Sequence, residues 1–525
     1  MMLAGPPLPT VLPIDEFLTF AHIASGERVA LATAEETWAY ADLKRGSVAL
    51  ARSYLALGLK PGDRIASLMP NDPWLVAHYL ACLASGLVAV PMGFKFASRR
   101  DIAEMTDIVG AATIVYDASR ESDITRACRG DLRVPPIRSG GSAPDGMQLQ
   151  KLGIPSGDDG GESGLPCTGG RLPGTAPAMI VFTSGSSGAR KGVVWTRSTV
   201  AARMASLARG VLPTGEMVIP ALSLSAGGGI DLTLSALLLG SAIALCPPTV
   251  DSILSALRRH RPLHMVSGPS TLLKLLHDNE TAPDDFRSIR SIAGGGDAVP
   301  AALDREVHAL LGRGINQGYG MTEIGICTAS HLHSEPVSGS IGTLMPGFEM
   351  ELRDADGAPV TVGSAGVAHV RSSTVTPGYW NDSVATERVL KDGWLDTGDL
   401  MRADAAGLLW FVNRQKHVII HDGANVLPSE VEDVLREDAA VSDAVAVGIH
   451  DPIHGQAICA FVTVNAGTDR SHEEIAAVAK EKLGEKAPEE LFVLQSMPLT
   501  AAGKVDRAAL TEYGNALFHK PHPEH

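Results

Sequence analysis

One glycine- and hydroxyl-rich stretch, FTSGSSGARKGVV at residues 182–194, has the residue types of an anion-binding loop. Glycines let backbone amides approach a ligand, and consecutive N–H groups in a turn form a concavity that hydroxyls and a lysine complete. This combination predicts a polyphosphate ligand. The spacing argues against a Walker loop, because Gly192 stands where that motif needs a hydroxyl residue. The residues predicted to contact the phosphates are Thr183, Ser184, Gly185, Ser186, Ser187, Gly188 and Lys191.

The same composition is also that of a flexible surface linker. The apolar runs AMIVF before the stretch and GVVWT after it are typical of short buried strands with turn residues between them. Two strands joined by a glycine turn would present the loop at a fixed place. We therefore expect a positioned binding loop, with the linker as the alternative.

The string NQGYGMTEIG, at residues 316–325, places an aromatic ring and a carboxylate at neighbouring turns. Tyr319 lies between glycines, where its face is free to stack on a base, and a core tyrosine is the alternative. Glu323 follows with Thr322, and a carboxylate beside a phosphate site usually holds magnesium. The string thus predicts contacts with a nucleotide base and a metal ion.

Three further polar residues stand near expected turns toward the C-terminus. Asp399 in WLDTGDL is of the type that accepts both hydroxyls of a ribose, and Arg414 in NRQKH follows an expected strand. Lys504 lies in the glycine-containing string PLTAAGK. Each has an ordinary alternative: a turn cap for the aspartate, solvated charges for Arg414 and Lys416, and a surface position for Lys504.

Composition and charge narrow the class of protein. The chain has 525 residues, of which 45% are hydrophobic, and a formal charge of −15. The length predicts several structural units, and the acidic balance argues against a nucleic-acid partner. The scattered cysteines lack metal-ligand spacing and no secretory signal opens the sequence, so we expect reduced thiols in a cytoplasmic protein. The apolar segment 218–247 contains Asp231 and a glycine cluster, so we expect a buried strand and helix there and no membrane span.

Hydrophobic periodicity predicts alternating helices and strands over most of the chain. Residues 29–90 and residues 199–293 each read as helices and short apolar strands joined by short loops, which predicts two doubly wound parallel sheets. Beyond residue 339, short alternating strands with Asp-Gly turns predict a compact β unit. Residues 415–525 read as a small α/β segment that is long enough to fold by itself.

The ordered strings TSGSSGARKG, GYGMTE, WLDTGDL, NRQKH and PLTAAGK resemble the adenylate-forming superfamily of acyl- and aryl-CoA synthetases, peptide-synthetase adenylation domains and luciferases. The resemblance spans residues 29–510 and is greatest to the acyl- and aryl-CoA ligases. It implies a large N-terminal domain at residues 1–415, with two doubly wound α/β subdomains and a β subdomain. A small mobile α+β C-terminal domain would occupy residues 416–525. The implied reaction uses ATP and Mg²⁺ to convert a carboxylic acid to acyl-AMP, releases pyrophosphate, and then forms a thioester with CoA.

The resemblance also implies a role for each matching residue. Tyr319 would lie against adenine, Thr322 near the α-phosphate and Glu323 on the magnesium ion. Lys504 would bridge the substrate carboxylate and the α-phosphate. The implied catalytic residues are Lys504, Thr322, Glu323 and Lys191, and further ATP or AMP contacts are implied for Gly295, Gly296, Asp297, Gly318, Gly320, Met321, Asp399 and Arg414.

The C-terminal part of the resemblance concerns domain movement and thiol access. Lys416 matches the hinge about which the C-terminal domain turns, and Gly423 matches the glycine that lets pantetheine pass. Asn413 and Asp422 stand where glycines are common in the family, so thiol access is expected to differ.

The acid-binding region departs from the common family pattern. A histidine found in many acyl- and aryl-CoA ligases is replaced by Ser223, or by Ser225 if the register shifts. The aspartate that holds the ammonium group in amino-acid-activating domains is missing, and Asp231 is a poor substitute, so we expect a non-amino acid. The glycine clusters predict a bulky, mainly apolar acid, or else simply serve the nucleotide. The predicted acyl-pocket residues are Ser223, Ser225, Gly227, Gly228, Gly294 and Met321.

The sequence does not decide the acceptor of the acyl group or the oligomeric state. Free CoA is the expected acceptor, and the phosphopantetheine of a carrier protein is the alternative within the same chemistry. A nucleotide-binding protein without catalysis is the alternative from another class. The chain is expected to be a monomer or a homodimer.

Overall fold

The computed structural model describes most of the chain, in residues 1–8, 26–94, 97–128, 132–140, 147–153, 172–184, 190–330, 335–421, 424–451, 455–465, 468, 470–500 and 505–518. Some predicted site residues lie outside these segments, and for Ser184 only the backbone is described. Those outside are Gly185, Ser186, Ser187, Gly188, Gly423 and Lys504.

The first α/β sheet has six strands in the order β7-β6-β4-β5-β8-β9, parallel except for β9. Its helices start and stop where the sequence provides caps: Asp72 accepts a hydrogen bond from the backbone of Trp74, and Gly86 ends the same helix in the left-handed region. The strands are β4 (Arg64–Leu68), β5 (Val88–Pro91), β6 (Thr113–Asp117), β7 (Ile137–Ser139), β8 (Pro177–Ser184) and β9 (Arg190–Thr196). The helices of this part are α2 (Tyr40–Ala56), α3 (Pro73–Ser85), α4 (Arg99–Val109), α5 (Glu121–Ala127) and α6 (Leu149–Leu152).

The second α/β sheet has nine strands in the order β16-β15-β14-β13-β12-β10-β11-β2-β3. Its central strands are parallel, and β3, β15 and β16 run antiparallel to their neighbours. The strands are β2 (Val29–Ala32), β3 (Thr37–Ala39), β10 (Met217–Ala221), β11 (Ala242–Ala244), β12 (His264–Ser267), β13 (Ser291–Gly295), β14 (Asn316–Met321), β15 (Gly325–Ala329) and β16 (Thr343–Leu344). The helices are α7 (Arg197–Gly210), α8 (Gly227–Leu238), α9 (Val250–His260), α10 (Pro269–Leu276) and α11 (Ala301–Leu311).

One strand assignment from the sequence needs a correction. The pattern placed the strand that starts at Val29 in the first sheet, but β2 pairs with β11 at the far side of the second sheet. The helix α2 that follows it returns to the first sheet's core, where Leu43, Leu50 and Tyr54 are fully buried. Local patterning cannot distinguish the two sheets, because both need the same short apolar strand.

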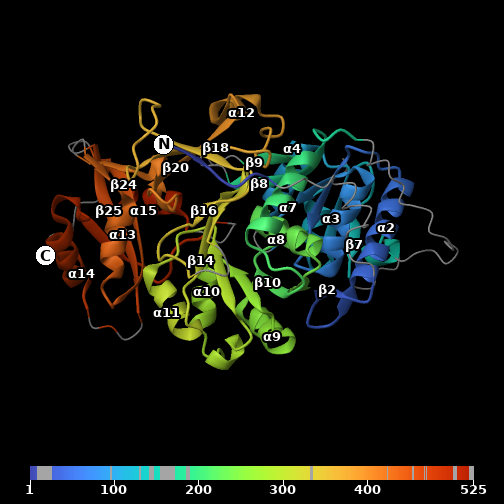
Figure 1. Cartoon of the computed structure of the whole chain (residues 1–525), viewed down its shortest axis with the longest axis horizontal. Helices are drawn as coiled ribbons and strands as arrows, with labels where there is room; N and C mark the ends of the chain where they lie inside the picture. The colour runs from blue at the N-terminus through green and yellow to red at the C-terminus, as the bar shows by residue number, and fades with distance from the viewer. Residues whose placement is uncertain are drawn as a thin grey trace.

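The third sheet is antiparallel and carries the predicted β unit. Its strands follow the order β1-β17-β18-β20-β19, with β21 paired to β20. The chain's first strand completes this sheet, so the blue N-terminal strand lies among yellow and orange strands in Figure 1. The elements are β1 (Met2–Ala4), β17 (Glu349–Arg353), β18 (Gly366–Arg371), α12 (Ser383–Val389), β19 (Leu390–Lys391), β20 (Trp394–Ala403) and β21 (Leu409–Arg414).

A separate small unit follows β21, at the left of Figure 1. Its five-stranded sheet is ordered β23-β22-β25-β24, with β26 paired to β25, and it has two apolar clusters of its own. The fold class predicted from the sequence is therefore confirmed: a large α/β part with an antiparallel β unit, and a small α+β part. The elements of the small unit are β22 (Ile419–His421), β23 (Ala424–Val426), α13 (Pro428–Arg436), β24 (Val441–Asp451), β25 (Gly455–Val464), α14 (His472–Leu483), β26 (Glu490–Val493) and α15 (Arg507–Phe518).

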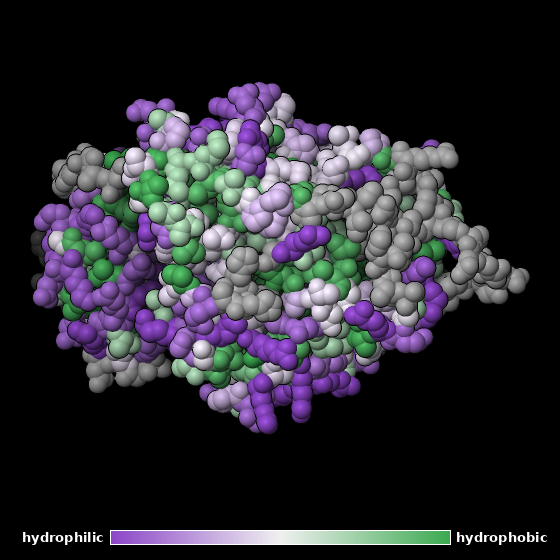
Figure 2. Space-filling view, in the orientation of Figure 1, coloured by the Kyte–Doolittle hydropathy of each residue, from purple (hydrophilic) through white to green (hydrophobic). Residues whose placement is uncertain are grey.

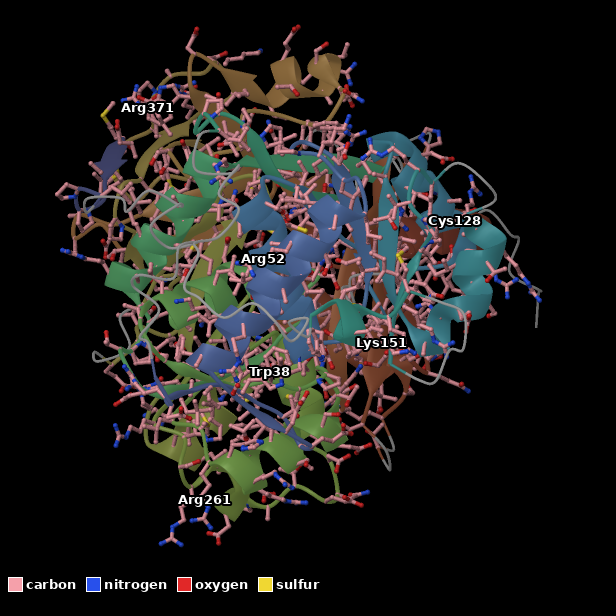
Figure 3. All side chains as sticks on the ribbon, turned by 90° about the vertical axis from the view of Figure 1, so that its right-hand side faces the viewer. Trp38, Arg52, Cys128, Lys151, Arg261 and Arg371 are labelled. Atoms are coloured by element: carbon pink, nitrogen blue, oxygen red, sulfur yellow. The ribbon has the colours of Figure 1, made fainter. Side chains whose placement is uncertain are left out.

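Two observations on the described residues concern membrane-spanning helices and cysteines. Among the described helices, none has the length and apolar character needed to cross a bilayer. Cys82, Cys128, Cys246, Cys327 and Cys459 are free thiols. Four are buried, and Cys128 lies half-buried at the end of α5, at the edge of the molecule in Figure 3.

Candidate active site

Predicted site residues within the described segments lie on strands of three sheets, and two tyrosines link these strands. Strands β8 and β9 pair on either side of the predicted phosphate loop, whose residues 185–189 lie outside the described segments, and Thr183 pairs directly with Lys191. In the second sheet, Gly295 at the end of β13 pairs with Gly318 of β14. In the third sheet, Asp399 of β20 pairs with Arg414 of β21. The ends of parallel strands are the usual binding position in open α/β sheets.

Glycines allow the strands of the second sheet to approach each other closely at this position. A Cβ atom on Gly320 would lie 2.4 Å from the carbonyl oxygen of Gly325, and one on Gly295 would lie 2.8 Å from that of Gly318. Gly296 has a φ of +85° and faces open space. Asp297 follows it and accepts a hydrogen bond from the backbone of Ala298. Gly296 thus lies in a left-handed turn with open space on its Cβ side.

Tyr319 connects the second sheet to the third. Its hydroxyl donates a 2.6 Å hydrogen bond to Oδ2 of Asp399, and its ring stacks on Phe411 with the centroids 6.4 Å apart. Asp399 is only 1% exposed, and its other oxygen, Oδ1, lies 3.1 Å from Nε of Arg414. Burial, reinforced by the Asp399 carboxylate, raises the pKa of Tyr319, so the phenol stays a donor.

Glu323 and Lys191 meet at a tyrosine that the sequence analysis did not single out. The hydroxyl of Tyr379 donates a 3.0 Å hydrogen bond to Oε1 of Glu323. The Nζ atom of Lys191 lies 4.9 Å from the centroid of the same ring, within cation–π range. Glu323 is 6% exposed and lies at the turn after β14, as the sequence predicted. Tyr379 stands in the string TPGYW, whose Pro-Gly pair marked a turn but gave no sign of its partners.

Two buried side chains donate hydrogen bonds to the backbone of the Thr322–Glu323 turn. Nε1 of Trp195 and a terminal nitrogen of Arg203 each donate 2.9 Å hydrogen bonds to the carbonyl oxygen of Thr322. The guanidinium of Arg203 lies 4.0 Å from the Trp195 ring centroid. These two residues were also missed from the sequence, because each is an ordinary member of an apolar strand or helix.

Asp231 has a structural partner. Its carboxylate lies 3.4 Å from Nη1 of Arg203, and both side chains are almost wholly buried. Burial outweighs the arginine and raises the pKa of Asp231 to about 6. The carboxylate faces Arg203 and is therefore engaged within the core.

Four of the six predicted acid-binding residues lie at the start of α8 or in the loop before it: Ser223, Ser225, Gly227 and Gly228. The hydroxyls of Ser223 and Ser225 are 2.9 Å apart, and Asn71 holds this loop by accepting from the backbone of Leu224. Gly227 packs against the indole of Trp195, whereas Gly228 faces open space. Figure 2 shows hydrophobic residues gathered over α8 in the middle of the displayed face.

At the two remaining positions of the glycine clusters, Gly229 and Gly294, close packing leaves no room for a side chain. A Cβ on Gly294 would lie 2.8 Å from Cγ2 of Ile315, and one on Gly229 would lie 2.2 Å from the carbonyl oxygen of Ser223. Met321 is the last residue of β14, with its sulfur 3.8 Å from the Tyr319 hydroxyl. The glycines thus serve close approach at most positions and leave an opening at Gly228.

Lys416 lies between the two parts of the fold. It belongs to the short 3-10 helix Gln415–His417, which follows the last strand of the third sheet and precedes β22. Burial and the neighbouring Arg414 lower the pKa of Lys416. The hydroxyl of Ser429, on α13, donates to the carbonyl oxygen of Val412, so the two parts also touch beside this segment.

The chain belongs to the AMP-binding enzyme family. The family profile matches residues 20–380, and the profile of the AMP-binding enzyme C-terminal domain matches residues 430–504. The resemblance seen in the ordered strings is therefore confirmed, and the protein is an enzyme of this family.

Individual relatives cover nearly the whole chain. A methyl-dioxo-octahydroindenyl-propanoyl:CoA ligase of Mycobacterium tuberculosis is 30% identical over 507 residues, covering 93% of this chain and 96% of that protein. A feruloyl-CoA synthase of an Amycolatopsis species is 28% identical, covering 89% of this chain and 92% of that protein. Among solved structures, the amide bond synthetase McbA from Marinactinospora thermotolerans superposes with a TM-score of 0.84 at 26% identity, covering 95% and 99% of the two chains.

Proposed function

We propose that this enzyme is an acid:CoA ligase that forms acyl-AMP and pyrophosphate from ATP and a carboxylic acid, and then transfers the acyl group to CoA. The observation that carries the proposal is a chain of contacts between three sheets: Tyr379 contacts both Lys191 and Glu323, and Tyr319 on β14 bonds to Asp399, which lies against Arg414. The CoA ligases among its full-length relatives support the same reaction.

The residues present fit a magnesium–nucleotide complex. Gly296 leaves the backbone open to a ligand, Glu323 supplies a nearly buried carboxylate, and Lys191 supplies a cation next to it. Asp399 and Arg414 would receive the ribose, Tyr319 the adenine, and Thr322 the α-phosphate. Glu323 would hold Mg²⁺, which neutralises phosphate charge when bound. The other proposed ATP contacts are Thr183, Ser184, Gly185, Ser186, Ser187, Gly188, Gly295, Asp297, Gly318, Gly320 and Met321.

The first half-reaction has to bring two anions together. A carboxylate is a weak nucleophile that a triphosphate repels, so the site must neutralise charge and align the attacking oxygen with the α-phosphorus. Lys191 and the loop amides would do this at the leaving phosphates. Lys504, delivered by the C-terminal part, would do it at the reacting carboxylate.

The second half-reaction would use a different orientation of the C-terminal part. We place the domain boundary between residues 415 and 416, next to the proposed hinge Lys416, because β21 closes one sheet and β22 opens another. Gly423 would then line the path of the pantetheine thiol. A mixed anhydride hydrolyses easily, so reshaping one site protects acyl-AMP between the two steps.

For the acid, we propose a bulky, mainly apolar carboxylic acid other than an amino acid. The pairing of Asp231 with Arg203 supports an acid other than an amino acid, because the Asp231 carboxylate is engaged in the core. The open space at Gly228 and the apolar surface over α8 support a bulky, mainly apolar acyl group. The feruloyl and octahydroindenyl-propanoyl relatives carry acyl groups of this kind.

The decisive experiment separates the two half-reactions. Acid-dependent ATP–pyrophosphate exchange over a panel of aryl, polycyclic and fatty acids identifies the acid, and its complete absence would return the chain to a non-catalytic nucleotide-binding role. Thioester formation is then compared with free CoA and with a phosphopantetheinyl carrier protein as acceptors. A free amine is the third acceptor, because an amide bond synthetase is among the structural relatives.

The Lys504→Ala variant tests the proposed division of work between the two parts. It should lose acyl-AMP formation while largely keeping thioester formation from supplied acyl-AMP. Equal loss of both half-reactions would contradict the role given to Lys504.

A further inference from the structure

A segment outside the recognised strings, residues 374–380, links the phosphate-loop strand to the Glu323 turn. On one side, the backbone N–H of Thr376 donates to the carbonyl oxygen of Glu323 at 2.7 Å. The hydroxyl of Thr374 donates to the carbonyl oxygen of Ile324 at 2.8 Å. On the other side, Trp380 donates to the carbonyl oxygen of Gly192 at 2.7 Å. We call residues 374–380 the linking segment.

Tyr379 is the residue of the linking segment whose side chain contacts both Glu323 and Lys191. Val193 and Tyr379 form a β-bridge, which fixes the tyrosine backbone beside β9. The Tyr379 N–H donates to the hydroxyl of Thr386 at 3.0 Å. A Cβ on Gly378, whose φ is +145°, would lie 2.5 Å from Cγ2 of Thr386, so glycine is required before the tyrosine. The ring is therefore held by backbone contacts that do not depend on its hydroxyl.

The Tyr379 hydroxyl is placed to orient a carboxylate. It donates to Oε1 of Glu323 at 3.0 Å, so it fixes the direction in which that oxygen points. Within the described part of the chain, no other side chain donates to Glu323. The ring meanwhile keeps Lys191 at 4.9 Å from its centroid, on the strand that leaves the phosphate loop.

We propose that Tyr379 is a positioning residue for adenylate formation, holding the Glu323 carboxylate in the orientation that receives Mg²⁺ and setting Lys191 beside it. The inference rests on the proposed function and adds a residue to it. Its consequence is specific: removing the hydroxyl alone should weaken the response of the enzyme to magnesium and leave nucleotide contacts made without the metal in place.

The test compares binding of ATP in the presence of magnesium with binding of ATP in EDTA, by isothermal titration calorimetry on the full chain. For Tyr379→Phe, we expect affinity for MgATP to fall by about tenfold, the usual scale for one hydrogen bond to a charged group. Affinity for ATP in EDTA should change by less than about twofold. Equal affinities of the variant and the wild type under both conditions would overturn the proposal.

Two further variants separate positioning from a general structural effect. Tyr40→Phe is the matched control, because its buried hydroxyl donates to the carbonyl oxygens of Leu237 and Ser241. It should lower thermal stability without changing the ratio of the two affinities. A change in that ratio as large as the one in Tyr379→Phe would contradict the proposal.

Glu323→Gln should abolish the magnesium effect, and adding Tyr379→Phe to it should weaken MgATP binding no further, because the two residues act on one group. Fully additive losses would contradict the proposal. Absence of exchange activity in the wild type would overturn the proposed function instead, whereas an active wild type with an unchanged Tyr379→Phe variant overturns this inference alone.

Discussion

The Tyr319 hydroxyl and the Asp399 carboxylate, 80 residues apart in the sequence, form a 2.6 Å hydrogen bond between two sheets. The bond occupies Oδ2 of a carboxylate that is 1% exposed, while Arg414 lies against Oδ1. The residue proposed to face adenine and the residues proposed to receive the ribose are therefore one connected unit. Substitution of Tyr319, Asp399 or Arg414 should therefore change the affinity for the nucleotide.

Tyr319→Phe tests this connection while keeping the aromatic face. Loss of a hydrogen bond to a charged group costs about 1.5–3 kcal/mol, so we expect the KM for ATP to rise by about tenfold or more. The kcat of pyrophosphate exchange should change little, because the lost contact is present before and during the reaction. A fall in kcat with an unchanged KM would contradict this assignment and indicate a role in the chemical step.

The Arg190–Asp101 ion pair joins the start of β9, directly after the proposed phosphate loop, to α4. The two groups are 2.6 Å apart and only partly exposed, at 22% and 18%. Arg190 is the first residue of β9 and Asp101 lies in the first turn of α4, so the pair joins these two elements. Although partial burial opposes it, hydrogen bonds from Ser98 and Arg190 keep the pKa of Asp101 below its usual value.

Asp101→Asn should loosen the loop exit and raise the KM for ATP by roughly threefold, as expected for a partly exposed pair worth under about 1 kcal/mol. The effect should shrink at high ionic strength, where salt screens the wild-type pair. Asp285→Asn is the matched control, because Asp285 also accepts from a helix-start backbone, at Ala282, and pairs with an arginine, Arg258. Equal changes in the KM for ATP in both variants would contradict a local effect at the loop.

Sequence alone predicted the parts of the site that depend on local chemistry. The strands β8 and β9 and the turn at Glu323 follow from glycines and apolar runs within a few residues, whereas the phosphate-binding role of the loop between the strands stays a prediction. The positions of Tyr379 and Arg203 could not be found this way, because their partners lie 56 and 119 residues away in the chain. The same limit explains β2, whose short apolar pattern suits either sheet.

Arg203 stabilises both the core and the turn that carries Thr322 and Glu323. Removing one partner of a buried ion pair leaves the other charge uncompensated, at a cost of about 3–5 kcal/mol. Arg203→Met should therefore lower the thermal midpoint strongly and raise the KM for ATP, since the Thr322 carbonyl loses a donor. Arg203→Met with Asp231→Leu should recover much of the stability, because it leaves no unpaired charge in the core.

Arg197→Met is the control for the loss of a buried arginine, since Arg197 donates to the carbonyl oxygen of Leu83. It should lower the midpoint and leave the KM for ATP unchanged. Differential scanning calorimetry and pyrophosphate-exchange kinetics on the same preparations make the comparison. If the double variant is as unstable as Arg203→Met alone, the pairing with Asp231 does not account for the loss.

Asp72 predicts a pH dependence of stability. Burial, with the nearby Glu36, Asp117 and Glu35 carboxylates, raises the pKa of Asp72 to about 6 from its usual 3.8, although the Trp74 N–H opposes the shift. The folded state therefore holds the proton more tightly than the unfolded state. The contribution of this group to stability is complete below about pH 4 and is lost as the pH rises toward 6 and above.

Asp72→Asn keeps a capping oxygen for α3 and removes the titration. We expect the variant to match the wild type near pH 4 and to be more stable at pH 7, by about 1–2 kcal/mol once the partial exposure of the group is taken into account. Thermal midpoints of both proteins, measured by calorimetry from pH 4 to pH 8, give the comparison. A wild type that gains stability relative to Asp72→Asn as the pH rises would show that ionised Asp72 is favoured in the fold, since only a lowered pKa produces that sign.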